Sequence, residues 1–291
     1  MRQAASWESV IVGGGPAGLA AGLHLARAGY RVLLVESGHL GGQARGLGRI
    51  ENYPGFPAGI DGGRLMERWV RQARRWGLRT RHATVRSARR GARGFLLSLD
   101  HGRALAARSL VYCPGAPFDD LALPQEKRLR GCGVFHAAFD RASRWSGRTV
   151  AVAGGGEAAA HQALALSRHA RAVHLICRSG EVKAHRLLRR RLRDNPRIVM
   201  SLGARVLRLH GRRRLEAVDV SSCGTRRRLA VDALFVLVGK VPPRLPFPAG
   251  RLPPGFFVAG DAAGEDRQVV VAAGSGVKAA MRCIGFLEGR P

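Results

Sequence analysis

The sequence predicts an α/β fold, and three observations support this prediction. The chain has 291 residues, enough for two hydrophobic cores of roughly 100 to 150 residues each. Its hydrophobic fraction of 46% and its 39 glycines fit a folded protein with many turns between strands and helices. A pattern of strand, glycine turn, helix and strand also occurs twice. We therefore expect two Rossmann-like three-layer domains, the second inserted into the first.

The two copies of the pattern lie 141 positions apart, measured from Gly13 to Gly154, which is about one domain length. In each copy a short apolar strand leads into a glycine turn, and an Ala/Leu-rich helix and a second strand follow. The predicted elements are strand 9–12, helix 16–28 and strand 31–36 in the first copy, and strand 149–153, helix 157–168 and strand 172–177 in the second. Two copies of one unit therefore account for the length.

The first turn matches the G-x-G-x-x-G pattern with Gly13, Gly15 and Gly18. Such glycines permit a tight turn and let backbone N–H groups approach a pyrophosphate at a helix N-terminus. In a chain this rich in glycine, the G-x-G-x-x-G pattern can occur by chance and is weak evidence of a dinucleotide site. Its position between a strand and a helix is stronger evidence. Glu36 ends the next strand, where a carboxylate can accept hydrogen bonds from ribose hydroxyls. The first copy therefore predicts an adenine-dinucleotide site.

The second turn reads Gly154-x-Gly156-x-x-Ala159 and also lies between strand and helix. No acid ends the following strand, which closes on Cys177 and continues with Arg178 and, five residues later, Lys183. Without a carboxylate a 2′-phosphate is not repelled, and a guanidinium can bind it with two hydrogen bonds. This favours NADPH over NADH. The alternative is that Arg178 is one more arginine in an arginine-rich chain.

The domain order follows from the strands that end each copy. Residues 109–115 and 233–239 are predicted to lead out of the first and second domains. The segments that remain, residues 256–261 and the helix-like stretch 269–287, are too short to fold alone. We therefore expect the chain to return to the first domain through the proline-rich stretch 241–254. We expect the domains to comprise residues 1–115, 116–240 and 241–291, with the first and last parts together forming one domain.

The net charge is +29, and only four of the 49 basic residues are lysine. The arginines are spread over most of the chain, with runs at 183–193, 212–214 and 226–228 in the second half. A solvated surface is the simplest interpretation. The functional alternative is attraction to an acidic protein partner or to polyanions without sequence preference. A dedicated nucleic-acid-binding role is not expected.

The five cysteines form no CxxC pair, and the ten histidines form no paired-ligand pattern. We expect no metal, and scattered thiols suit a reducing compartment. The apolar stretch 10–26 is similar to a signal peptide, but its glycines and Pro16 would break a helix and it is too short to span a bilayer. We expect a cytoplasmic protein that does not enter a membrane.

Seven motifs occur in order along the chain: GGGPAGLAA (13–21), GGQ (41–43), ENYPGF (51–56), GGGEAA (154–159), VHLICR (173–178), FVAGD (257–261) and RQVVVAAGSG (267–276). In sequence and in order they resemble the low-molecular-weight thioredoxin reductase family of FAD-dependent pyridine nucleotide-disulfide oxidoreductases. The resemblance runs through nearly the whole chain. The resemblance implies FAD and NADPH as cofactors, a homodimer, and a domain rotation that presents the flavin alternately to nicotinamide and to its oxidant.

The two turns and the resemblance together imply a set of cofactor-binding residues. In such proteins the segment similar to 41–52 approaches the FAD, the aspartate similar to Asp261 bonds its ribityl region, and the run similar to 267–269 lies near the isoalloxazine. The FAD set is Gly13, Gly15, Pro16, Ala17, Gly18, Glu36, Ser37, Gly42, Gln43, Asn52, Gly115, Gly260, Asp261, Arg267, Gln268 and Val269. The NADPH set is Gly154, Gly155, Gly156, Glu157, Ala158, Arg178 and Lys183.

The chain departs from the family at the redox pair. Where such reductases carry CxxC before an aspartate, this chain has His136 and Phe139 at the two cysteine positions, followed by Asp140. A dithiol relay needs two neighbouring thiols. Cys132 could supply one thiol but has no resolving partner in sequence, and the alternative is a buried structural cysteine. The chain therefore resembles a CxxC-less subgroup, with His136 and Asp140 as candidate catalytic residues.

Two functions remain open from sequence. In the first, NADPH reduces FAD and electrons pass directly to a small disulfide, a redox protein, a quinone-like molecule or oxygen, with His136 as proton donor or merely as a space filler. In the second, the chain is an FAD-binding regulatory module whose basic surface binds an acidic partner. The connection 240–254 is also shorter than the hairpin region of the family. A less complete FAD domain, with lower affinity for the flavin, is therefore an open alternative.

Overall fold

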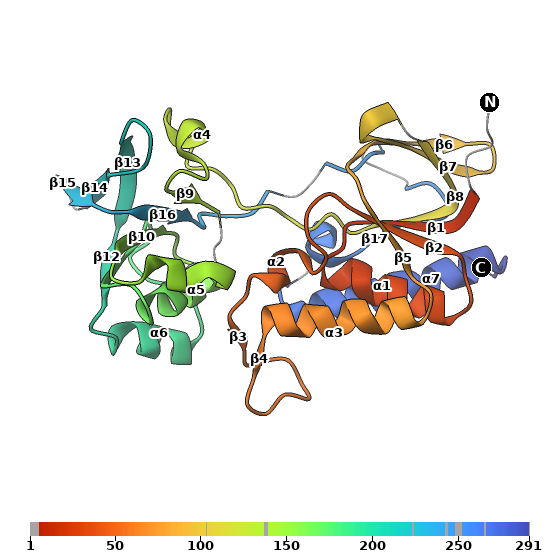
Figure 1. Cartoon of the computed structure of the whole chain (residues 1–291), viewed down its shortest axis with the longest axis horizontal. Coiled ribbons are helices and arrows are strands. Elements are labelled where there is room, and N and C mark those ends of the chain that lie inside the picture. The colour runs from red at the N-terminus through yellow and green to blue at the C-terminus, as the bar shows by residue number, and fades with distance from the viewer. Residues whose placement is uncertain are drawn as a thin grey trace. The chain divides into compact units, whose positions relative to one another are not determined.

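The computed structural model describes residues 6–102, 104–136, 139–222, 224–241, 244–247, 252–264 and 266–290. The chain divides into two compact units (Figure 1). Unit 1 comprises Met1–Ala116 and Pro242–Pro291, and unit 2 comprises Pro117–Val241. Each unit is built on its own main sheet, mixed in unit 1 and parallel in unit 2, so each is described separately.

Unit 1 contains a seven-stranded sheet in the order β5-β2-β1-β8-β7-β6, with β17 also paired to β8. Its strands are β1 (Ser6–Val12), β2 (Val32–Glu36), β5 (Arg79–His82), β6 (Val85–Gly91), β7 (Gly94–Leu99), β8 (Ala104–Tyr112) and β17 (Phe256–Val258), and β3 (Arg49–Ile50) pairs with β4 (Ile60–Asp61). The helices are α1 (Pro16–Arg27), α2 (Gly42–Arg45), α3 (Gly62–Arg75) and α7 (Val269–Leu287), with short 3₁₀ turns at Asp100–Gly102 and Gly260–Ala263.

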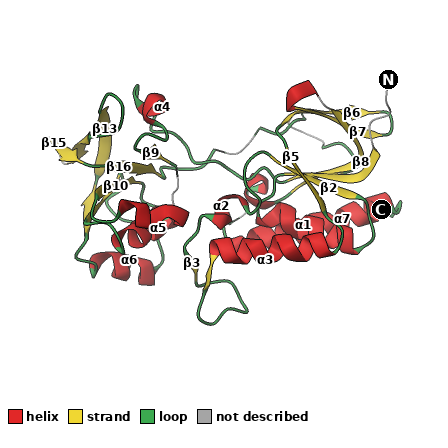
Figure 2. Cartoon of the chain, in the orientation of Figure 1, coloured by secondary structure: helices red, strands yellow, loops and turns green. Residues whose placement is uncertain are grey.

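The sheet of unit 1 has two buried faces because successive side chains along a strand point in opposite directions. Ile11 and Leu34 pack into the core formed with α1, α3 and α7. Val10 and Leu33 pack on the other face, against the antiparallel β6–β7 hairpin and β8. Figure 2 shows the helices of this unit on one side of the strands and the hairpin on the other. Unit 1 thus has three layers.

Unit 2 contains a parallel sheet in the order β12-β11-β10-β16-β9. Its strands are β9 (Val134–Phe135), β10 (Thr149–Ala153), β11 (Ala172–Cys177), β12 (Ile198–Leu202) and β16 (Ala233–Val236), and a separate antiparallel sheet comprises β13 (Ala204–His210), β14 (Ala217–Ser222) and β15 (Thr225–Ala230). The helices are α4 (Glu126–Leu129), α5 (Glu157–Ser167) and α6 (Arg186–Arg193), with a 3₁₀ segment at Phe139–Trp145.

Unit 2 repeats the layered plan of unit 1. Val150 and Val152 face the core formed with α5 and α6. Ala151 and Ala153 face the opposite core, which is covered by β13 and β14. The predicted class, an α/β protein with two Rossmann-like domains, is confirmed.

Among the described residues, α7 is the helix that is long and apolar enough to cross a membrane by length and composition. It lies instead along α1, and the carbonyl oxygen of Ala17 approaches Gly276 so closely that an added Cβ would sit 2.1 Å from it. Its alanine-rich face, including Ala272 and Ala280, is buried in the core of unit 1. The apolar composition of α7 therefore serves helix packing within unit 1.

Candidate cofactor sites

The first glycine turn joins β1 to α1 and is built for a ligand. Gly13 has φ +101°, and a Cβ there would lie 2.0 Å from the carbonyl oxygen of Cys113. A Cβ on Gly18 would lie 1.9 Å from the oxygen of Gly13, so this glycine lets helix and strand pack closely. A Cβ on Gly15 would meet nothing within 4 Å. Gly15 thus leaves free space at the helix N-terminus, where a pyrophosphate binds in such turns.

Glu36 closes one side of the first turn. Its Oε2 accepts a hydrogen bond from the Gly14 N–H at 2.6 Å, and its Oε1 accepts one from the Gly38 N–H at 2.6 Å. The carboxylate is therefore fixed at the end of β2, next to the turn. A carboxylate in this place is the group that accepts hydrogen bonds from the ribose of a bound dinucleotide. Ser37, the predicted neighbour, is exposed beside it.

The segment 41–43 folds back onto the first turn. The N–H of Gly41 donates to the Gly14 carbonyl at 2.7 Å, and a Cβ on Gly42 would lie 3.0 Å from the Cα of Gly15. Gln43 Nε2 donates to the carbonyl of Ala116 at 2.8 Å, next to the predicted Gly115. Three stretches distant in sequence thus meet around one turn.

The returning chain also reaches the start of α1. Gly260 has φ +70°, and a Cβ there would lie 2.8 Å from the Cβ of Ala17, the residue after Pro16. Asp261 follows directly in the 3₁₀ turn. Asn52 Nδ2 donates to Gln268 Oε1 at 2.9 Å, which places the 52 and 267–269 segments side by side. The structure therefore gathers the predicted FAD residues into one region of unit 1.

The second turn, between β10 and α5, repeats this design. Gly154 has φ +149°, and a Cβ there would lie 2.4 Å from the oxygen of Leu237. A Cβ on Gly155 would lie 2.3 Å from the sulfur of Cys177, whereas a Cβ on Gly156 would meet nothing within 4 Å. Glu157 and Ala158 form the first residues of α5. Gly156 therefore leaves the free space that Gly15 leaves in the first turn.

The two turns also share their backbone hydrogen bonds. Gly13 N–H donates to Val35 at 2.9 Å, and Gly154 N–H donates to Ile176 at 2.9 Å. The residue that follows each acceptor is Glu36 in unit 1 and Cys177 in unit 2. Cys177 is fully buried, and its thiol lies 3.3 Å from the carbonyl oxygen of Glu181. The second turn therefore carries a buried thiol where the first carries a carboxylate.

Two cations follow Cys177. Arg178 is exposed directly after β11. The N–H of Lys183 donates to the Gly155 carbonyl at 2.6 Å, which fixes this residue beside the turn. Neither side chain has an ion-pair partner within the described part of the chain. The mouth of the second turn is therefore positively charged.

His136, at the position of the first family cysteine, lies among carboxylates. Its Nε2 is 2.8 Å from Asp120 Oδ1 and 3.8 Å from Glu126 Oε1. Asp120 also pairs with Arg130 at 2.6 Å. Glu126 is buried, and its carboxylate accepts hydrogen bonds from the backbone of Leu121 and Leu123. Sequence reasoning missed Asp120 and Glu126, because nothing local in the sequence links them to a histidine ten or more residues downstream.

The ligand atoms of Asp120, Glu126 and His136 lie within 4.8 Å of one another, close enough to hold a cation. Arg130 already neutralises Asp120, and backbone N–H groups already bind Glu126. Ion pairing therefore accounts for the cluster, and the expected lack of a metal stays a prediction. The backbone of Asp140 belongs to the 3₁₀ segment Phe139–Trp145, but its side chain lies outside the described residues.

The described cysteines are all free thiols. Cys113, Cys177 and Cys283 are buried, and burial raises the pKa of the Cys113 thiol to about 12. Cys132 is exposed, so the interpretation of this residue as a buried structural cysteine is wrong. Gly131 and Gly133 flank it in a turn before β9, and this turn leaves its side chain at the surface.

The arginines of the run 226–228 form ion pairs and hydrogen bonds with other residues of unit 2. Arg226 and Arg228 pair with Asp219 at 2.8 and 3.0 Å, and Arg227 donates to the hydroxyl of Ser201 at 2.7 Å. The run 186–193 forms the exposed face of α6, with Leu188 and Leu192 buried beneath it. Part of the positive charge thus stabilises unit 2 itself.

Two dinucleotide turns on one chain, the first followed by a strand that ends in Glu36 and the second by a strand that ends in Cys177, define a class of oxidoreductase that uses two different dinucleotides. Residues 7–251 match the family described as pyridine nucleotide-disulphide oxidoreductase, and the chain belongs to this family. This match confirms the family resemblance that the motifs indicated. Membership of a CxxC-less subgroup stays a prediction.

Its relatives include thioredoxin reductases. The chain is 30% identical to the thioredoxin reductase of Treponema pallidum, over 97% of both chains. It is 32% identical to the bifunctional thioredoxin reductase/thioredoxin of Mycobacterium leprae, over 94% of this chain but only 64% of that protein. The fold matches the crystal structure of Lactococcus lactis thioredoxin reductase with a TM-score of 0.90, at 24% identity, over 97% of this chain and 99% of that chain.

Thioredoxin reductases of this family use FAD and NADPH. The residues present fit both groups: Gly15 and Gly156 leave room for a pyrophosphate, and the strand after the first turn ends in the carboxylate Glu36, whereas the strand after the second turn ends in Cys177. The cofactor prediction is thereby confirmed at the level of the family.

Proposed function

We propose that this protein is an FAD-dependent NADPH oxidoreductase without a dithiol relay, passing electrons from NADPH through FAD directly to an external acceptor. The bound dinucleotides would supply the hydride and electron chemistry, and the chain would bind and orient them. The acceptor would be a small disulfide, a redox protein, a quinone-like molecule or oxygen. The proposal includes a homodimer, which follows from the family resemblance, and a cytoplasmic location, which follows from the scattered cysteines and the glycine-interrupted apolar stretch 10–26.

The observation that supports the proposal most strongly is that the described cysteines do not include an exposed, neighbouring pair. The sequence has no CxxC, and His136 and Phe139 stand where the redox pair would be. Of the described cysteines, only Cys132 is exposed. Cys113 and Cys177 belong to the strand ends beside the two glycine turns, and both are buried. A relay needs a reactive thiolate with a resolving partner, and no described pair of cysteines offers one.

His136 is the proposed proton donor to the acceptor. Asp120 holds its Nε2 at 2.8 Å, which fixes the imidazole and leaves Nδ1 for a second partner. An imidazole can both donate and accept a proton at its ring nitrogens, which makes histidine a common general acid. Asp120 would act as a positioning residue, and Asp140 keeps its proposed place in the site from the family motif.

NADPH is the proposed electron donor in preference to NADH. Cys177 replaces the carboxylate that would repel a 2′-phosphate, and Arg178 and Lys183 supply positive charge next to the turn. A guanidinium binds a phosphate with two charge-assisted hydrogen bonds. The charge arrangement thus supports a phosphorylated ribose.

The test is anaerobic mixing of the FAD-loaded protein with NADPH, followed by addition of acceptors from each class. We expect the oxidised flavin absorbance to bleach and then to return with at least one acceptor. His136→Gln should slow reoxidation at neutral pH, whereas Cys132→Ser, the matched thiol control, should leave both phases unchanged. A flavin that stays oxidised would exclude the enzyme.

That negative result would favour the alternative, a regulatory FAD-binding module that uses the +29 charge to bind an acidic partner. Such a complex should weaken steeply with salt.

A further inference from the structure

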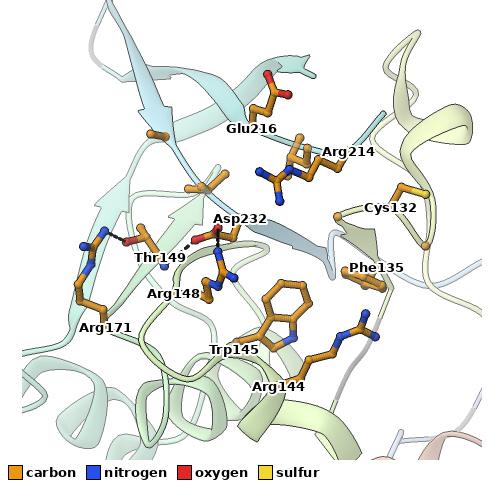
Figure 3. A pocket seen from close by; sticks show the side chains of 15 residues that line it. Cys132, Phe135, Arg144, Trp145, Arg148, Thr149, Arg171, Arg214, Glu216 and Asp232 are labelled. Atoms are coloured by element: carbon orange, nitrogen blue, oxygen red, sulfur yellow. Dashed lines mark hydrogen bonds and ion pairs between the residues drawn. The ribbon is translucent and has the colours of Figure 1, made fainter. Parts of the chain in front are cut away.

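A pocket of about 500 Å³ in unit 2 is not explained by either cofactor turn (Figure 3). Its wall includes Thr149, Arg171 and Asp232. Thr149 begins β10, Arg171 immediately precedes β11, and Asp232 immediately precedes β16. The pocket therefore lies at the amino ends of these parallel strands. The turn at Gly154 follows their carboxyl ends, about 15 Å away along a five-residue strand.

The charge of the pocket is distinctly positive. Its lining contains four arginines but only two carboxylates, Glu216 and Asp232. Arg148 pairs with Asp232 at 3.0 Å, and Arg171 donates to the hydroxyl of Thr149 at 3.0 Å. These two arginines are thus held in place by the strands themselves.

The other two arginines are not neutralised. Arg144 and Arg214 form no ion pair with any residue in the described ranges, and both are exposed. Arg214 comes from the loop between β13 and β14, whereas Arg144 comes from the 3₁₀ segment before β10. Two elements distant in sequence therefore bring unpaired positive charge to one concave surface.

The base of the pocket is aromatic. Phe135 and Trp145 line it, with ring centroids 5.6 Å apart in an edge-on arrangement. Both rings also pack on the buried Phe235, at 5.7 and 5.8 Å, so their positions are fixed from below. In Figure 3 the guanidinium group of Arg144 lies beside these two rings, 6.0 Å from the centroid of the Trp145 ring, and Arg214 lies farther from them, toward Glu216. A flat ring can stack on such a base, and guanidinium groups can bind its anionic substituents.

We propose that this pocket is a second ligand site, for a small aromatic anion that carries carboxylate or phosphate groups on a flat ring. Arg144 and Arg214 bind the anionic groups, and Phe135 and Trp145 bind the ring. The inference does not depend on the proposed function, because it concerns binding and not turnover.

Isothermal titration calorimetry tests the proposal on the full chain saturated with FAD and NADP⁺, so that neither dinucleotide turn is free. The probes are benzene-1,3-dicarboxylate and phenyl phosphate, which separate the two anionic groups, and the uncharged benzene-1,3-dicarboxamide. We expect a Kd on the order of 1 mM or below for at least one anion and no binding of the diamide.

The double variant Arg144→Gln/Arg214→Gln should weaken binding by at least about tenfold. Its matched control is Arg212→Gln/Arg213→Gln, which removes the same charge from neighbouring side chains outside the pocket and should leave the Kd within about twofold. The proposal is overturned if neither anion binds at 20 mM, roughly twenty times the expected Kd. Equal weakening by both double variants would also overturn it, because binding would then follow only the net charge.

Discussion

Glu36 and Cys177 occupy equivalent positions in the two glycine turns. Each ends the strand that follows the helix after the turn, one residue after the carbonyl that binds the first glycine of the turn. Glu36 accepts two backbone hydrogen bonds there, whereas the thiol of Cys177 lies buried against the Glu181 carbonyl. In the proposed function, this difference helps the first turn to bind an unmodified ribose and the second turn to bind a ribose with a 2′-phosphate.

Replacing Glu36 with Gln should weaken FAD binding about tenfold to a hundredfold. The carboxylate would lose its charge-assisted hydrogen bonds, both to the turn and to the ribose. Flavin fluorescence during titration with FAD measures the affinity. Glu288→Gln, at the exposed end of α7, is the control and should bind FAD normally. An unchanged Kd in Glu36→Gln would remove this residue from the site.

Replacing Arg178 and Lys183 together with Gln should lower the preference for NADPH over NADH by at least about tenfold. Each side chain supplies charge for a 2′-phosphate, and hydrogen bonds to charged groups are the strong ones. The ratio of kcat/KM for the two nucleotides measures the preference. Arg193→Gln, exposed on α6, should not change the ratio. If the ratio is the same in the double variant, the selectivity arises elsewhere.

Alanine substitutions should separate the roles of the glycines. Gly15→Ala and Gly156→Ala add a methyl group to open space, so thermal stability should hold while FAD and NADPH affinity, respectively, falls at least about tenfold. Gly18→Ala places a methyl group 1.9 Å from a backbone oxygen and should destabilise the protein by about 2–4 kcal/mol. Melting temperatures and ligand titrations distinguish these outcomes, and equal losses of stability would contradict them.

The Asp219 cluster predicts a specific pH dependence of stability. Hydrogen bonds from His210 and then Arg228 and Arg226 hold the pKa of the Asp219 carboxyl well below its usual range. Because the folded pKa is the lower one, this stabilisation is present above the unfolded value of about 4 and is lost as the pH falls toward the folded value. Asp219→Asn should therefore melt roughly 5 °C below the parent at pH 7, with a smaller gap at pH 3.

Asp194→Asn is the matched control for this comparison. Asp194 forms only an exposed pair with Arg190 at 3.4 Å, so its loss should leave the melting temperature nearly unchanged at both pH values. If the difference in melting temperature between Asp219→Asn and the parent is as large at pH 3 as at pH 7, the charge of Asp219 is not the cause of the lost stability.

The elements predicted from sequence were those with strong apolar runs. β10, β11 and α7 begin and end at the predicted residues because they are apolar and bounded by turns. β1 begins at Ser6, three residues before the predicted start, since its first residues are polar. The β6–β7 hairpin and the β13–β15 sheet were not predicted. Exposed arginines dominate strands such as β15. Apolar and polar residues therefore do not alternate there, and alternation is the sequence signal of a strand.

Of the candidate sites, too, only those with a local sequence pattern could be predicted. The turns around Gly13 and Gly154 could be predicted because a fixed local spacing produces their geometry. Neither the contact of His136 with Asp120 nor the arginine pocket has such a pattern, because each depends on segments brought together by the tertiary fold. Only the folded chain reveals that Cys132 is exposed.

In the proposed function, FAD is the sole redox centre of this chain. An anaerobic reductive titration with dithionite measures this, because it counts the electrons that the protein takes up. The FAD-loaded protein should take up two electrons per flavin, and Cys132→Ser should take up the same number. Uptake of four electrons per flavin, with two of them lost in Cys132→Ser, would reveal a redox-active disulfide and contradict the account.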